Sequence, residues 1–156
     1  MKFVKGNILD AEHGIIGHQV NCRMVMGAGL AKQIRDRYPS VYSEYKEIMG
    51  AAPLESRLGK CQIVQVMPDL YIANLFGQLN YFPRSVQHTN YNALSMALHG
   101  LSNWRSINWP NNPEAMPIYL PSGLGCGLAG GDWEIVKGLI SSSIPNAIIV
   151  RFENPK

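Results

Sequence analysis

The sequence has few of the features that mark membrane, secreted or nucleic-acid-binding proteins. Only 16% of its 156 residues are charged, and the net charge of +3 is spread along the chain rather than gathered in a basic tail. This pattern argues against sequence-specific nucleic-acid binding. The apolar runs extend over only a few residues, whereas a membrane span needs about 20. Gly6, Asn7 and Asp10 interrupt the N-terminal segment before a signal-peptide core could form, so we expect a cytoplasmic protein without membrane contact.

The cysteines are also too few and too scattered for a disulfide framework or a zinc site. Cys22, Cys61 and Cys126 are odd in number and far apart, with no CxxC pair and no histidine at a suitable spacing. Structural zinc sites and disulfide frameworks both need such groupings. We therefore expect reduced thiols, no bound metal and no cofactor. Cys61 in particular is expected to be a small buried hydrophobe.

What the sequence does contain is enough apolar material for one core. A hydrophobic content of 46% over 156 residues corresponds to a single domain spanning residues 1–156. Short β-rich runs alternate with stretches of helical periodicity, which predicts an α/β fold with helices on both faces of a central sheet. The runs 61–67 and 70–76 are separated by the turn pair Pro68-Asp69. They predict a hairpin, and hence a mixed rather than purely parallel sheet.

The boundaries of the expected elements follow from periodicity and turn residues. Pro39 should stop the first helix, and Asn103–Pro117, rich in Asn and Pro, should be a packed surface loop. Asp132 is expected to cap the last helix. Strands are predicted at 2–9, 14–21, 61–67, 70–76, 116–121 and 146–153, helices at 29–39, 41–49, 90–104 and 132–143, and a loop at 52–59.

Two glycine-rich segments share one physical design. The segment MGAGLAK begins at Met26 and SGLGCGLAGGDW begins at Ser122, and each follows a strand and opens a helix. Glycine lets backbone N–H groups approach an anion, and the N-terminus of a helix adds about half a positive charge. Glycines at such junctions also serve simply as tight turns. Two such loops at the carboxyl ends of strands in one α/β sheet nevertheless predict a pocket that suits a diphosphate.

The second loop also offers a rival interpretation. Gly125, Gly127 and Gly130 form a GxGxxG pattern, and Glu153 lies at the end of the next predicted strand. The spacing of these glycines and Glu153 is similar to that of a dinucleotide-binding fingerprint. It would favour an NAD-dependent oxidoreductase. Only one further strand follows this pattern, which leaves no chain in which to build a substrate domain. A P-loop is excluded because GAGLAK contains no GxxxxGK[ST] pattern.

Taken together, several segments closely resemble the macrodomain family. They are VKGNIL, GHQVNC, MGAGLAKQIRDRYP, GKCQIV, TNYNAL and PSGLGCGLAGGDWEIV, and they occur in the order and spacing of that family along nearly the whole chain. The resemblance is to the branch that includes ADP-ribose 1''-phosphate phosphatases, terminal ADP-ribose glycohydrolases and many phage-encoded macrodomains. It implies a three-layer α/β/α sandwich, with a mixed, mostly parallel sheet, that binds ADP-ribose or a derivative across the top of the sheet.

The resemblance also implies positions for the ligand. Asn7 and Ile8 would lie beside the adenine, where many family members carry Asp in place of Asn7, and Phe152 would stack on it. Asn21 would hydrogen-bond the distal ribose. The diphosphate would be held by Met26, Gly27, Ala28, Gly29 and Leu30 in the first loop and by Ser122, Gly123, Leu124, Gly125, Cys126 and Gly127 in the second.

His18 is the candidate catalytic residue, because it matches a histidine of yeast-type ADP-ribose 1''-phosphate phosphatases. An imidazole can act as general acid or base on water or on a leaving oxygen. A satisfied structural histidine is the alternative. Ala129 stands where terminal glycohydrolases carry an acid, and FGQLNYFPRSVQH lacks their lysine, although its Arg84 and His88 could overhang the ligand. Three functions therefore stay open. They are a hydrolase of ADP-ribose 1''-phosphate or a related derivative, a non-catalytic module for ADP-ribose or an ADP-ribosylated macromolecule, and, from the GxGxxG pattern alone, an NAD-dependent oxidoreductase.

Overall fold

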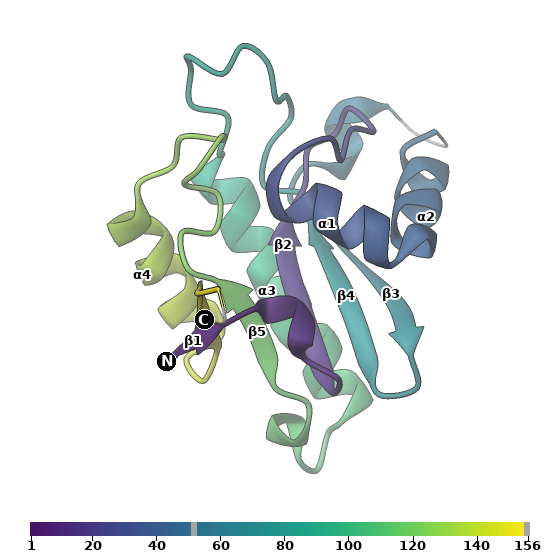
Figure 1. Cartoon of the computed structure of the whole chain (residues 1–156), viewed down its shortest axis with the longest axis vertical. Helices are drawn as coiled ribbons and strands as arrows, with labels where there is room; N and C mark the ends of the chain where they lie inside the picture. The colour runs from purple at the N-terminus through teal and green to yellow at the C-terminus, as the bar shows by residue number, and fades with distance from the viewer. Residues whose placement is uncertain (51–52, 155–156) are drawn as a thin grey trace.

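A computed structural model describes residues 1–50 and 53–154 and contains a six-stranded sheet in the order β1-β6-β5-β2-β4-β3 (Figure 1). All neighbouring strands are parallel except the hairpin partners β3 and β4. The strands are β1 (Lys2–Gly6), β2 (Gly14–Gln19), β3 (Cys61–Met67), β4 (Leu70–Leu75), β5 (Ile118–Pro121) and β6 (Ile148–Phe152), and the helices are α1 (Gly29–Arg37), α2 (Pro39–Gly50), α3 (Tyr91–Asn108) and α4 (Trp133–Ser143). The predicted hairpin and mixed sheet are confirmed.

The helices cover both faces of the sheet, so there are two cores. Side chains alternate between the faces of a strand. Ile15 therefore packs in the cluster that includes Leu98 of α3 and Ile140 of α4, whereas Ile16 packs in the cluster of Ile34 and Tyr45 from α1 and α2. This division matters for the site, because His18 of β2 and Val20, just after β2, lie on the face of α1 and α2.

The helix boundaries follow from capping and from proline. Asp132 caps α4 as predicted, since its Oδ1 accepts a hydrogen bond from the Glu134 N–H at 2.9 Å. Asn90 caps α3 in the same way through the Ala93 N–H, at 3.0 Å. α1 ends before Pro39, as expected, but the same proline is the first residue of α2, which begins two residues before the predicted position. Proline is well suited to a first helical turn because its missing N–H is not needed there.

Other predicted boundaries were also wrong. The strand expected over 2–9 ends at Gly6, and Ile8–Asp10 forms a short 3-10 helix. The loop expected over 103–117 begins as helix, because α3 continues to Asn108. Arg105 is buried there and donates to the Met116 carbonyl at 3.3 Å and to Asn146 Oδ1 at 3.0 Å. The loop expected over 52–59 contains a 3-10 turn at Leu54–Arg57, and its first residue lies outside the described residues.

Candidate functional site

A cavity of about 590 Å³ opens at the carboxyl ends of β5, β2 and β4. The N-terminus of α1 borders it on one side, and the loop after β5 borders it on another. In open α/β sheets this is the edge at which ligands collect. The lining residues are His18, Gln19, Val20, Asn21, Val25–Ala31, Gln78, Tyr81, Arg84, Pro121–Gly125 and Gly127–Ala129.

The first glycine loop presents the N-terminus of α1 to this cavity. Ala28 is the N-cap of α1 and has no side chain that could accept a hydrogen bond from the first turn. The first turn of α1 also has no acidic residue. Gly29 has a φ of 57°, a conformation that favours glycine. The N–H groups of this turn are therefore available to an anion, with the positive end of the helix dipole behind them.

Asn21 organises the chain that leads into the first loop. Its Oδ1 accepts from the Arg23 N–H at 2.9 Å, and its Nδ2 donates to the Val25 carbonyl at 2.8 Å. The buried Tyr45 hydroxyl lies 2.7 Å from the Asn21 carbonyl oxygen and 2.9 Å from its Oδ1. Most of the hydrogen-bonding capacity of Asn21 is thus used within the protein. One Nδ2 hydrogen remains for a ligand.

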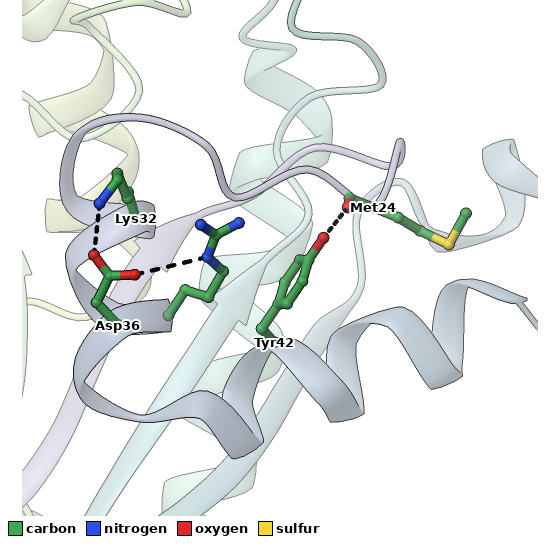
Figure 2. A network of polar contacts seen from close by, with 5 residues as sticks. Met24, Lys32, Asp36 and Tyr42 are labelled. Carbon is green, nitrogen blue, oxygen red and sulfur yellow. Dashed lines mark hydrogen bonds and ion pairs between the residues drawn. The ribbon is translucent and has the colours of Figure 1, made fainter.

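Tyr42 holds the same segment from α2 (Figure 2). Its hydroxyl donates to the Met24 carbonyl at 3.0 Å, and Met24 has a φ of 62°. The Arg35 guanidinium lies 5.2 Å from the Tyr42 ring centroid, a cation–π distance. Lys32 binds Asp36 at 2.6 Å, and this hydrogen bond lowers the pKa of the Asp36 carboxyl. The Tyr42 hydroxyl thus ties the segment that leads into the first loop to α2, and the Arg35–Tyr42 contact joins α1 to α2.

The second glycine loop is fixed by Gln19, which the sequence reasoning missed. Gln19 Nε2 donates to Gln78 Oε1 at 2.8 Å and to Thr89 Oγ1 at 2.9 Å, and Thr89 donates to the Gly125 carbonyl at 2.6 Å. Gly125 has a φ of 70°, and a Cβ there would lie 2.8 Å from Gln19 Oε1, so a larger residue would strain the backbone and displace the Gln19 side chain. The available signal was a glutamine within an otherwise apolar strand, directly after His18.

His18 lies at the cavity but is almost wholly buried, with 2% of its surface exposed. Its Nε2 is 2.6 Å from Asn74 Oδ1, and its Nδ1 is buried without a hydrogen-bond partner among the described residues. Burial lowers the pKa of His18 to about 4, and the hydrogen bond to Asn74 opposes this only in part. The imidazole is therefore neutral at pH 7. The imidazolium form of His18 is therefore not populated at that pH, and Nδ1 faces no hydrogen-bond partner among the described residues.

The structure brings most of the predicted site residues to this one cavity. They are His18, Asn21, Met26, Gly27, Ala28, Gly29, Leu30, Ser122, Gly123, Leu124, Gly125 and Gly127. Four others lie outside its lining. Asn7 caps the short 3-10 helix through the Leu9 N–H at 3.0 Å, Ile8 is buried in the core, and Phe152 is 62% exposed at the end of β6. Cys126 donates its S–H to the Leu124 carbonyl at 3.2 Å and packs toward the core of α3 and α4.

The loop between β4 and α3 forms an arch beyond the sheet (Figure 1). Tyr81 and Arg84 of this arch line the cavity, so Arg84 does overhang it. His88 does not line the cavity, because its Nε2 lies 2.6 Å from the Pro83 carbonyl oxygen. Phe82, next to Tyr81 in the arch, is 74% exposed. The cavity mouth is therefore cationic and aromatic on the side of the arch.

No family model matches the sequence. An uncharacterized 17.5 kDa protein from the tk–vs intergenic region of Enterobacteria phage T4 is 28% identical over 160 residues, which cover 98% of this chain and 97% of the phage protein. Among solved structures, a protein of unknown function from Bacteroides thetaiotaomicron superposes with a TM-score of 0.83 at 23% identity and covers 97% of each chain.

Two further solved structures identify the architecture. The macrodomain of Mycobacterium tuberculosis DarG matches with a TM-score of 0.75 at 23% identity, over 99% of this chain and 97% of that one. Thermosipho africanus DarTG, solved in complex with ADP-ribose, matches with a TM-score of 0.71 at 17% identity, over 99% of this chain and 42% of that one. The chain has the macrodomain fold. The expected mixed, mostly parallel sheet between helical layers is thereby confirmed.

The macrodomain fold also resolves the rival interpretation of the second loop. In a dinucleotide fingerprint the third glycine packs within the helix. Here α4 begins at Trp133, after the capping Asp132, and Gly130 lies instead against Gln87 of the arch. Glu153 lies in a separate small hollow with Lys5, Arg151 and Phe152. These residues therefore do not assemble the dinucleotide site that the pattern imitated.

Over 1–50 and 53–154, no group of three His, Cys, Asp or Glu side chains is arranged to hold a metal ion. Within the same part of the chain, no helix has the length and apolar character needed to cross a membrane. The cysteines Cys22, Cys61 and Cys126 are free thiols.

Proposed function

We propose that the cavity binds ADP-ribose and that the protein hydrolyses a derivative substituted at C1'' of the distal ribose, such as ADP-ribose 1''-phosphate. The observation that carries this proposal is that both glycine loops line a single cavity. The macrodomain fold, shared with a DarTG protein solved with ADP-ribose, supports the choice of ligand. A diphosphate is the anion that two facing loops of backbone N–H groups suit best.

The strand order gives the ligand a direction. The cavity lies over β5, β2 and β4, and the next strands along the sheet are β6, which ends at Phe152, and β1, which ends at Gly6 directly before Asn7. The adenine would therefore lie over β6 and β1, where the exposed Phe152 ring can stack and the Asn7 amide can form a hydrogen bond. The diphosphate would lie between the two loops. The distal ribose would reach Asn21 and His18.

In the proposed hydrolysis, His18 acts as the general base. Its Nδ1 takes a proton from water, the water oxygen bonds to phosphorus, and the bond from phosphorus to the C1'' oxygen breaks. The protonated imidazole then returns its proton to the leaving oxygen. The products are phosphate and ADP-ribose. With a pKa of about 4, the imidazole is already deprotonated at neutral pH and is a weak base.

A non-catalytic binding module is the second candidate, and the burial of His18 favours it. The Nδ1 atom is not exposed to solvent, and Ala129 lines the cavity where a carboxylate would assist glycoside cleavage. In this case the ligand could be an ADP-ribosyl group on a macromolecule, with the attached group lying against Tyr81, Phe82 and Arg84 of the arch.

Incubation with ADP-ribose 1''-phosphate separates the two candidates. The hydrolase releases inorganic phosphate in repeated turnovers, and His18→Gln abolishes that release. Binding of ADP-ribose without phosphate release by the wild-type protein would refute the hydrolase and retain the binding module.

A further inference from the structure

Three polar side chains form a row across the sheet on the face of α1 and α2. Gln62 of β3 is the register partner of Asn74 in β4, and Asn74 is the register partner of His18 in β2. Asn74 Nδ2 donates to Gln62 Oε1 at 3.0 Å, and Asn74 Oδ1 lies 2.6 Å from His18 Nε2. Gln62 Nε2 donates in turn to the backbone carbonyl of Glu44 in α2, at 3.0 Å. The row thus runs without a break from a helix backbone to the cavity.

The backbone carbonyl at the far end determines the direction of every hydrogen bond in this row. A carbonyl oxygen can only accept, so Gln62 must turn its NH₂ group toward Glu44 and its oxygen toward Asn74. Asn74 must then turn its NH₂ group toward Gln62 and its oxygen toward His18. The opposite orientation of either amide would place two oxygens or two NH₂ groups against each other. Such amide orientations are decided by the hydrogen-bond network as a whole.

We propose that Gln62 and Asn74 are positioning residues that hold His18 as the Nε2–H tautomer and leave Nδ1 as its only free acceptor. The other neutral tautomer would place the Nε2 lone pair 2.6 Å from the Asn74 oxygen. Asn74 is fully buried, so water cannot replace the lost donor. The tautomer itself follows from the hydrogen bonds alone, and only its catalytic use depends on the proposed hydrolase.

Side-chain nitrogen NMR of the full chain tests this inference directly. In the wild-type protein we expect the Nε2 of His18 to show the shift of a protonated nitrogen and its Nδ1 the shift of an unprotonated one. Gln62→Leu frees the Asn74 amide to turn over, and Asn74→Leu removes the acceptor, so both variants should give a mixture of tautomers. Asn74→Asp removes the donor to Gln62 but keeps an acceptor opposite Nε2, so Nε2 should stay protonated in this variant.

Gln65→Leu is the matched control, because Gln65 lies on the same strand but is exposed and donates to the Pro68 carbonyl. It should leave the His18 signals unchanged. An Nδ1–H tautomer in the wild-type protein, or an unchanged tautomer in folded Gln62→Leu and Asn74→Leu proteins, would overturn the inference.

Kinetics of phosphate release separate this inference from the proposed function. If His18 is the base, Gln62→Leu should lower kcat by about tenfold or more with little change in KM, as for other groups that orient a reacting imidazole. If the tautomers change as expected while no variant and no wild-type protein releases phosphate, the positioning role stands and the hydrolase is refuted.

Discussion

Acidification should destabilise this protein through His18. The pKa of His18 is about 4 in the folded protein, because burial disfavours the charged imidazolium, against 6.5 for an ordinary histidine. Between these values the unfolded chain binds a proton that the folded chain does not, so stability rises with pH in that window. The contribution of His18 is therefore fully present above pH 6.5 and is lost as the pH falls toward 4.

The linkage relation gives the size of this effect. For these two pKa values, the free energy of unfolding should fall by about 2 kcal/mol between pH 7.5 and pH 5.0 on account of His18 alone. Urea unfolding at both pH values measures the change. His18→Gln removes the titrating group while keeping an NH₂ donor for Asn74, and this variant should lose about 2 kcal/mol less than the wild-type protein over the same interval.

His13→Gln provides the matched control, since His13 is exposed and lies outside the cavity. This variant should show the wild-type pH dependence. If the wild-type and His18→Gln proteins lose the same free energy of unfolding on acidification, the argument from burial is refuted.

Three further predictions concern the two loops and the proposed chemistry. His18→Gln should lower the turnover of ADP-ribose 1''-phosphate, measured by phosphate release, by about 100-fold or more. Its affinity for ADP-ribose, measured by calorimetry, should be unchanged. Unchanged turnover would rule out His18 as the base. Gly125→Ala should lower the free energy of unfolding, measured in urea, by about 1–3 kcal/mol, because φ is 70° and the new Cβ would meet Gln19. Gly123→Ala, whose new Cβ would meet open space, should lower it less. Equal losses in the two variants would contradict the role of Gln19. Tyr45→Phe should destabilise the protein by about 1–3 kcal/mol, because Asn21 loses a buried donor. The same preparation should bind ADP-ribose more weakly. Unchanged affinity would show that the hydrogen bonds of Tyr45 do not support the binding site.

Local signals in the sequence were sufficient for much of the fold and for the two loops. These signals act over only a few residues. They are the proline after an amphipathic stretch, the Asp before a helix and the Pro-Asp turn between two apolar runs. The structure confirms the prediction made from each of them. The glycine loops were recognisable for the same reason. Asn21 and His18 were found through their place in a family-like segment, and the structure places both at the cavity.

The residues that sequence reasoning missed depend on contacts between distant parts of the chain. Gln19 touches Thr89 and the second loop, and Asn74 meets His18 only because β2 and β4 pair in one particular register. No local pattern specifies that register. The helical start of the predicted 103–117 loop has a similar origin, since Arg105 finds its partners in Met116 and Asn146. Tertiary contacts there outweigh the local preference of an Asn-rich and Pro-rich segment for a loop.

Calorimetric titration with ADP-ribose tests the central claim most directly when the wild-type protein is compared with Gly127→Val and Gly138→Val. Gly127 lines the cavity and Gly138 lies in α4, and an added Cβ meets no atom within 4 Å at either position. We expect the wild-type and Gly138→Val proteins to bind one ADP-ribose, and Gly127→Val to bind more than about tenfold more weakly, a loss of at least about 1.4 kcal/mol. Absence of binding by the wild-type protein, or equal binding by all three, would contradict the assignment of this cavity as the ADP-ribose site.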